Sequence, residues 1–199
     1  MAAFILSCLY KAAFVSGINI NYLLVNKTKR TEIKTSTRTL ILGIGNPILR
    51  DDRVGHFLIQ ELRSRFSSPG IELQETSFAG LNLAELLLGF DSVIIIDAIQ
   101  SGGVPGAVYC LKPRDFHTKS VNHYGQHGTG LLQAMELGKA LGWPMPEDVT
   151  IVAIEAEDLT SFGDDLTPAV AKAVPTALKI ILELLDGQHE QPCEKLKTS

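Results

Sequence analysis

From Thr39 onward, short runs of apolar and β-branched residues alternate along the chain with longer segments of helical period. The short runs predict strands, and the longer segments, with apolar residues three or four positions apart, predict helices. The expected strands are Thr39–Gly43, Ile71–Thr76, Ser92–Asp97, Ala107–Leu111 and Val149–Ile154. The expected helices are Val54–Phe66, Leu81–Leu88, Gly130–Leu141 and Pro168–Leu185.

The composition of the strands indicates how they are layered. Val93 to Ile96 are apolar without interruption, which is typical of a strand with helices on both faces of its sheet. The stretch from Ser101 to Gly106 is too short for a helical crossover, so the next strand is expected to run antiparallel to its predecessor. We therefore expect an α/β three-layer sandwich, with a mixed, mostly parallel five-stranded sheet flanked by helices.

The last helix has a recognisable start. Thr167 is suited to the N-cap, and Pro168 to the first helical position, where its missing N–H is not needed. Pro175 is expected to kink or divide this helix, because a proline inside a helix removes one hydrogen bond and clashes with the preceding turn.

The chain divides by composition into an N-terminal extension (1–38), one globular domain (39–186) and a polar tail (187–199). The extension is apolar and then basic, but Lys11, Ser16 and Asn19 interrupt the apolar run, which falls short of the roughly 18 uncharged residues that a spanning helix needs. Two interpretations remain open: a non-native upstream extension from a misplaced start, or a real arm that is poorly ordered or touches a membrane. We expect no membrane partner.

Charge and cysteine content narrow the class further. The formal net charge of −4 leaves no basic surplus for nucleic acid. Cys8, Cys110 and Cys193 lack CxxC spacing, which disfavours a thiolate zinc site or a disulfide framework and favours a reducing cytoplasm. Cys110, inside an apolar strand, is expected to be an inert buried thiol. The size is compatible with a monomer.

Three candidate ligands stand in separate loops. Asp52 follows the first strand, Asp97 ends the third, and His127 precedes a helix. In open α/β sheets, ligands bind beyond the carboxyl ends of the parallel strands, so these side chains could converge at one edge. Two carboxylates and an imidazole are the ligands of an oxygen/nitrogen metal site.

Each of these residues also has a plainer interpretation. Asp52 could interact with a helix dipole, and Asp97 could cap the turn that begins at Gln100. His127 could be a solvated loop histidine, and His123 is close enough to take its place. The three residues together, more than any one of them, indicate a site.

The glycine turn after the first strand suggests a competing function. Gly43 and Gly45 resemble the start of a dinucleotide fingerprint, but Ile48 stands where the third glycine is required. Pro47 also lies in a segment that would not bring a pyrophosphate to a helix N-terminus. Nucleotide binding is therefore disfavoured, and the absence of GxSxG disfavours a serine nucleophile.

Together these segments resemble the nickel-iron hydrogenase maturation endopeptidases, a family of hydrogenase maturation proteases. The matching segments, in the family's order, are Leu42–Gly55 (LGIGNPILRDDRVG), Ile95–Ile99 (IIDAI), His127–Leu131 (HGTGL) and, more weakly, Leu166–Val170 (LTPAV). The first segment is the specific one, and the resemblance extends over about 39–185.

The resemblance implies a nickel-dependent, metal-assisted or aspartic-type endopeptidase. Its partner would be the large-subunit precursor of a nickel-iron hydrogenase, from which it removes a C-terminal extension after nickel insertion. Asp52, Asp97 and His127 match the family's metal-binding and catalytic positions, with Asp52 where some members carry glutamate. Nickel would be delivered by the substrate, and Asp51 would be a supporting or helix-capping group. The alternative is a non-proteolytic nickel-binding or metallochaperone module.

Overall fold

The computed structural model describes residues 38–65, 67–78, 81–113, 115 and 126–187. The predictions for the N-terminal extension and for the tail from residue 188 concern residues outside this description. The described elements are, in chain order, β1 (Thr39–Ile44), α3 (Val54–Arg65), β2 (Ile71–Thr76), α4 (Leu81–Leu86), β3 (Ser92–Ile99), β4 (Val108–Leu111), α5 (Gln126–Ala140), β5 (Asp148–Glu155) and α6 (Pro168–Leu185).

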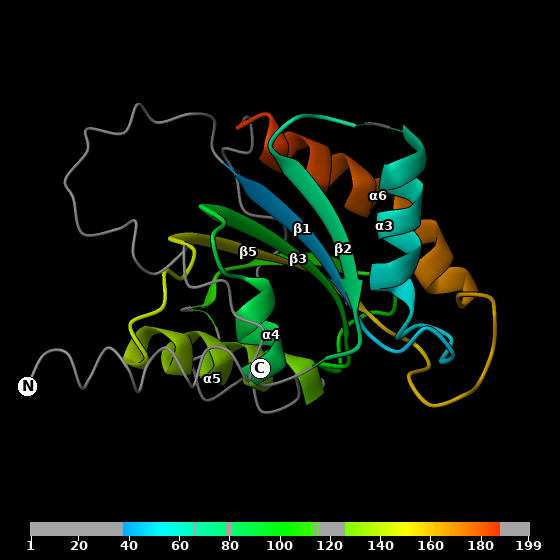
Figure 1. The fold of residues 1–199 in the computed structure, drawn as a ribbon. Coiled ribbons are helices and arrows are strands. Elements are labelled where there is room, and N and C mark those ends of the chain that lie inside the picture. Colours follow the sequence, from blue (N-terminus) through cyan, green and yellow to red (C-terminus); the bar gives the residue numbers. More distant parts are fainter. Residues whose placement is uncertain (1–37, 66, 79–80, 114, 116–125, 188–199) are drawn as a thin grey trace, which may run out of the picture. The chain divides into compact units, whose positions relative to one another are not determined.

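The five strands form one mixed sheet in the order β2-β1-β3-β5-β4 (Figure 1). Four strands are parallel, and β4 is antiparallel to β5. The predicted direction of β4 is therefore confirmed, but its neighbour is β5 rather than its predecessor β3. The reason is that β3 pairs with β5 along its whole length, from Ser92 with Asp148 to Ile99 with Glu155, which leaves β4 the outer edge of β5.

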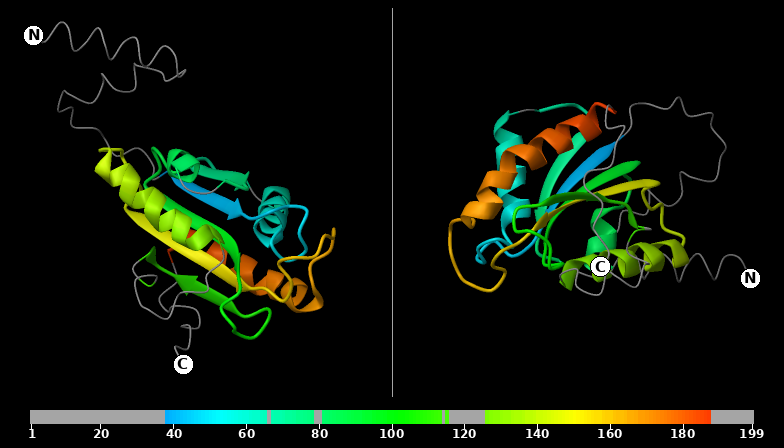
Figure 2. Two further views of the ribbon diagram at one scale, coloured as in Figure 1. Left: turned by 90° about the horizontal axis from the view of Figure 1, so that it is seen from below. Right: turned by 180° about the vertical axis from the view of Figure 1, so that it is seen from behind.

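Helices cover both faces of the sheet, as the apolar strands predicted. Helices α3 and α6 lie on one face and α4 and α5 on the other, and the further views show the same three layers (Figure 2). Alternate residues of β1 and β3 point into two separate cores. Leu40 and Ile95 pack with residues of α4 and α5, whereas Ile41 and Ile96 pack with residues of α3 and α6.

Helix α6 begins as predicted, but Pro175 does not divide it. The Thr167 side chain accepts a hydrogen bond from the Val170 amide, and Pro168 is the first helical residue. The helix continues unbroken to Leu185 with Pro175 in its interior. Buried residues on both sides of Pro175, including Val170 and Leu178, hold the two halves against the sheet, and this packing offsets the lost hydrogen bond.

Two element boundaries change the setting of the candidate ligands. Strand β3 continues two residues beyond its predicted end, so Asp97 lies inside the strand. Helix α5 begins at Gln126, four residues before its predicted start, so His127 lies in a first helical turn and not in a loop. Gly128 and Gly130 have low helix propensity, which is why the sequence predicted a later start. The helix overrides that preference.

The prediction of a free thiol at Cys110 is wrong, because Cys110 is disulfide-bonded. Strand β4 is an edge strand with a half-buried Cys110, which leaves the sulfur accessible in a way that a central strand would not. Along the part of the chain that the structure describes, no helix is both long enough and apolar enough to cross a membrane.

Candidate active site

The strand order changes direction at the carboxyl ends of β1 and β3. From β1 the chain passes through α3 to β2 on one side, and it later enters β3 on the other side of β1. Such a reversal is a topological switch point, where open α/β sheets bind their ligands. Asp52 lies in the connection that follows β1, and Asp97 lies near the end of β3, so both carboxylates lie at this switch point.

The glycines of the β1–α3 connection bring helix and strand together. A Cβ atom on Gly43 would lie 2.3 Å from the carbonyl oxygen of Gly55, so α3 can approach β1 this closely only with glycine there. Gly45 has a φ of 142°, and its Cβ atom would lie 1.8 Å from the Asp52 carbonyl oxygen. The glycines that resemble a phosphate-binding turn therefore serve to place Asp52.

Asp52 is buried, with 8% of its surface exposed, and one of its oxygens is held by the backbone. The Asn46 amide donates a hydrogen bond of 2.8 Å to Oδ2. Among the described residues nothing donates a hydrogen bond to Oδ1. Asp52 thus has a fixed carboxylate with one oxygen available to a ligand.

Asp97 is more deeply buried, and its Oδ1 atom has no hydrogen-bond partner within the described structure. Burial raises the pKa of Asp97 well above its usual range, the negative charge of Asp52 raises it further, and the Ala98 backbone amide opposes the rise. A buried carboxyl with an unpartnered oxygen beside a second carboxylate is unfavourable by itself and favourable once a cation is present. The carboxylate oxygens therefore fit a divalent metal.

Glu155, which the sequence did not single out, caps the turn that follows β3. In the alternative interpretation, Asp97 would have capped this turn. Its carboxylate accepts hydrogen bonds from the Ser101 amide (2.7 Å), the Ser101 hydroxyl (2.6 Å) and the Gly103 amide (3.0 Å). Glu155 ends β5 beside Ile99, so the turn after β3 receives its cap from the neighbouring strand. Asp97 is not needed there.

The substitution Glu155→Ala should loosen this turn without removing a ligand. The Ser101 and Gly103 amides would lose their acceptor, which should destabilise the fold by about 1–3 kcal/mol. Chemical denaturation at neutral pH measures the change. An unchanged midpoint would show that the Glu155 hydrogen bonds contribute nothing to stability.

Asp51 has a different role from its neighbour. It is fully buried and accepts four hydrogen bonds, from the amides of Glu157, Asp158 and Thr167 and from the Thr167 hydroxyl, all between 2.8 and 2.9 Å. The expectation that Asp51 supports the site without being a ligand agrees with these contacts. As a capping group, however, it serves the start of α6 through Thr167 and not the start of α3.

The β1–α3 connection and the segment between β5 and α6 are joined by backbone hydrogen bonds. Leu49 forms an isolated antiparallel bridge with Phe162. The Arg50 amide donates to the Ser161 carbonyl (3.0 Å), and the Gly163 amide donates to the Ile48 carbonyl (3.2 Å). This pairing fixes the connection that carries Asp52.

The structure places only the backbone of the third candidate, His127. Helix α5 leads into β5, and β5 begins at the amino ends of the parallel strands. The first turn of α5 therefore lies on the side of the sheet where the carboxyl ends of β1 and β3 are found. The His127 side chain, like His117, His123 and His189, lies outside the described part of the structure. Within the described side chains there is no group of three His, Cys, Asp or Glu residues placed to hold a metal ion.

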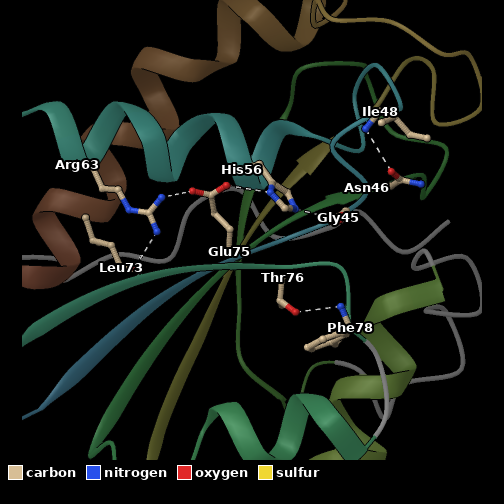
Figure 3. A network of polar contacts seen from close by, with 9 residues as sticks. All are labelled: Gly45, Asn46, Ile48, His56, Arg63, Leu73, Glu75, Thr76 and Phe78. Atoms are coloured by element: carbon tan, nitrogen blue, oxygen red, sulfur yellow. Dashed lines mark hydrogen bonds and ion pairs between the residues drawn. The ribbon is translucent and has the colours of Figure 1, made fainter.

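His56 is a polar residue next to the β1–α3 connection that no sequence pattern singled out. It lies on α3 and contacts the Gly45 carbonyl oxygen and the Glu75 carboxylate, as Figure 3 shows. No sequence spacing signals these contacts, because they join three separate elements.

Comparisons with known proteins agree with this fold. The family model described as hydrogenase maturation protease matches residues 57–184, which include Asp97 and His127. The hydrogenase 2 maturation protease of Escherichia coli (strain K12) is 29% identical over 150 residues, covering 74% of this chain and 90% of that protein. The hydrogenase expression/formation protein HoxM of Azotobacter vinelandii is 28% identical over 156 residues, covering 76% of this chain and 73% of that protein.

A solved structure, the hydrogenase maturating endopeptidase HybD from E. coli, superposes with a TM-score of 0.66. It is 29% identical in sequence, and the match covers 76% of this chain and 93% of that one. Because the family model matches well over half of the chain, the chain belongs to the hydrogenase maturation protease family. It is a hydrogenase maturation endopeptidase.

Proposed function

We propose that this protein removes the C-terminal extension from the large-subunit precursor of a nickel-iron hydrogenase after nickel has been inserted. Family membership supports the class of reaction. The observation that carries the dependence on nickel is the pair of buried carboxylates, Asp52 and Asp97, with an unpartnered oxygen on Asp97. Such a pair is incomplete until a cation is present, and a nickel-loaded precursor would bring one.

The residues of the chain would act in the following way. Asp52, held through Oδ2 by the Asn46 amide, presents Oδ1 to the substrate's metal. Asp97 would meet the cation through its unpartnered Oδ1 atom, and the cation would offset the burial and the charge of Asp52, which both raise the pKa of Asp97. His127, from the first turn of α5, would supply the third ligand. The substrate's nickel, once held, supplies Lewis-acid activation of the peptide bond or of a water molecule.

This arrangement would make cleavage a checkpoint. A precursor without nickel brings no cation to the two buried carboxylates and nothing to orient its peptide bond, so it should be a poor substrate. The protein needs no resident metal for this mechanism. Its monomeric state and cytoplasmic location, expected from the sequence, stay predictions.

The test is a cleavage assay with a large-subunit precursor from the same cell. We expect the nickel-loaded precursor to be shortened and the nickel-free precursor to stay intact, and we expect His127→Ala to abolish the shortening. Mass spectrometry of the product locates the cut. Equal cleavage of loaded and nickel-free precursor would overturn the dependence on nickel. Absence of cleavage, with tight binding of free Ni²⁺ in calorimetry, would favour the non-proteolytic alternative.

A further inference from the structure

His56 lies between an acceptor of the β1–α3 connection and an acceptor of β2 (Figure 3). Its Nε2 atom is 3.0 Å from the Gly45 carbonyl oxygen, and its Nδ1 atom is 3.0 Å from Glu75 Oε2. The carbonyl oxygen and the carboxylate oxygen are both acceptors, so both contacts are hydrogen bonds when both ring nitrogens carry a proton, with Nε2 donating to Gly45. His56 thereby contacts the carbonyl side of the turn that leads to Asp52.

The Gly45 carbonyl belongs to the same peptide group as the Asn46 amide. That amide donates the hydrogen bond of 2.8 Å to Asp52 Oδ2. Because a trans peptide group is planar, with its C=O and N–H pointing in opposite directions, fixing the carbonyl fixes the direction of the N–H. A hydrogen bond accepted by the carbonyl also polarises the group and strengthens its N–H as a donor.

This peptide group needs such an anchor because of Gly45. Gly45 has a φ of 142°, a region in which glycine is free and other residues are strained. With no Cβ atom to resist rotation, the peptide after Gly45 can turn over and carry the Asn46 amide away from Asp52. The bond from His56 opposes that rotation.

His56 itself is fixed from the other side. Glu75, near the end of β2, contacts His56 Nδ1 and forms an ion pair with Arg63, which also donates to the Leu73 carbonyl (3.0 Å) (Figure 3). The His56 and Glu75 side chains are only 11% and 19% exposed. The contact with Glu75, which Arg63 holds in place, restricts the imidazole to the orientation that reaches Gly45.

We propose that His56 is a positioning residue for the peptidase reaction, which locks the Gly45–Asn46 peptide group so that its N–H holds Asp52 Oδ2 and leaves Oδ1 directed to the substrate's metal. The inference rests on the proposed function for its effect on cleavage. The orientation of the peptide group is independent of that function and can be measured separately. Loss of a group that orients a metal ligand typically lowers affinity or activity about 10–100-fold.

Two variants separate positioning from packing. Glutamine places its amide nitrogen near the position of Nε2 and can still donate to Gly45, whereas asparagine places its amide nitrogen near Nδ1 and can reach only toward Glu75. His56→Gln and His56→Asn remove the same ring from the same partly buried position, so a role in packing alone would affect both.

The readouts are cleavage kinetics with nickel-loaded precursor and the NMR signal of the Asn46 amide in the free protein. For His56→Asn we expect kcat to fall about tenfold with KM nearly unchanged. We also expect the Asn46 amide proton to move upfield and to exchange faster with solvent. His56→Gln should stay near the wild type in both measurements.

Equal behaviour of the two variants, or an unchanged Asn46 amide in His56→Asn, would overturn the proposal. If the wild type fails to cleave any loaded precursor, the proposed function fails, and the NMR comparison still decides whether His56 orients the peptide group. Thermal unfolding of each variant confirms that the comparison is made between folded proteins.

Discussion

Changing Asp97 to asparagine should abolish cleavage and at the same time make the free protein more stable. Asparagine has the shape of aspartate without the charge, so it removes a buried negative charge whose neighbour, Asp52, is also acidic. The pKa of Asp97 is raised well above its usual range, so ionising this carboxyl costs the folded protein stability. We expect a higher free energy of unfolding, by about the 1 kcal/mol that is typical of single substitutions, and a higher Tm.

Cleavage of nickel-loaded precursor by this variant should fall by at least about 100-fold, because a neutral amide replaces an anionic ligand. Calorimetry and the cleavage assay measure the two effects in one preparation. The matched control is Glu147→Gln, an exposed position just before β5 begins and therefore at the opposite edge of the sheet. It should change stability by less than about 0.5 kcal/mol and leave cleavage intact. A loss of stability in Asp97→Asn would contradict the ligand interpretation and favour a structural role.

The stability gain should depend on pH with a definite sign. Below the ordinary aspartate pKa, about 4, Asp97 is protonated in both the folded and the unfolded protein, and the variant has no electrostatic advantage. As pH rises, the unfolded chain ionises first, and the folded protein loses stability until pH passes its raised pKa. The difference in Tm between variant and wild type should therefore grow from about pH 4 upward. A difference that is constant over this range would contradict the raised pKa.

The same substitution at the adjacent residue, Asp51→Asn, should have the opposite effect on stability. The Asp51 carboxylate accepts four hydrogen bonds, so each of its oxygens faces donors. The amide nitrogen of asparagine would be a donor facing donors, and at least one buried N–H or O–H would lose its partner. We expect a loss of about 2–4 kcal/mol, which lowers Tm by roughly 5–15 °C.

Differential scanning calorimetry measures this loss, and Asp164→Asn is its control. Asp164 belongs to the same connection before α6, but its side chain is fully exposed, so the change there should be within about 0.5 kcal/mol. We expect Asp51→Asn to cleave loaded precursor at temperatures well below its new Tm, since Asp51 holds the connection and not the metal. Complete loss of cleavage in the folded variant would make Asp51 part of the reacting site.

Local pattern was sufficient for the framework of the fold. The strand from Ile71 to Thr76 and the helix from Pro168 to Leu185 have the bounds that their composition predicted. Uninterrupted apolar residues in β3 correctly indicated helices on both faces of the sheet. These features depend on residues within a few positions of one another, which is the range over which periodicity and capping residues carry information. The start of α5 was missed because Gly128 and Gly130 have low helix propensity.

The sequence by itself determined the family, the layered α/β fold and the placement of Asp52 and Asp97 near the ends of parallel strands. Tertiary structure alone decided what each polar side chain does there. Asp51 and Asp52 are neighbours with nearly identical surroundings in sequence, yet the partners of Asp51 lie between 106 and 116 positions away. Glu155 caps a turn 54 positions earlier, and His56 reaches Glu75 from another element. Hydrogen bonds between elements depend on how the sheet brings distant segments together, and no local pattern records that arrangement.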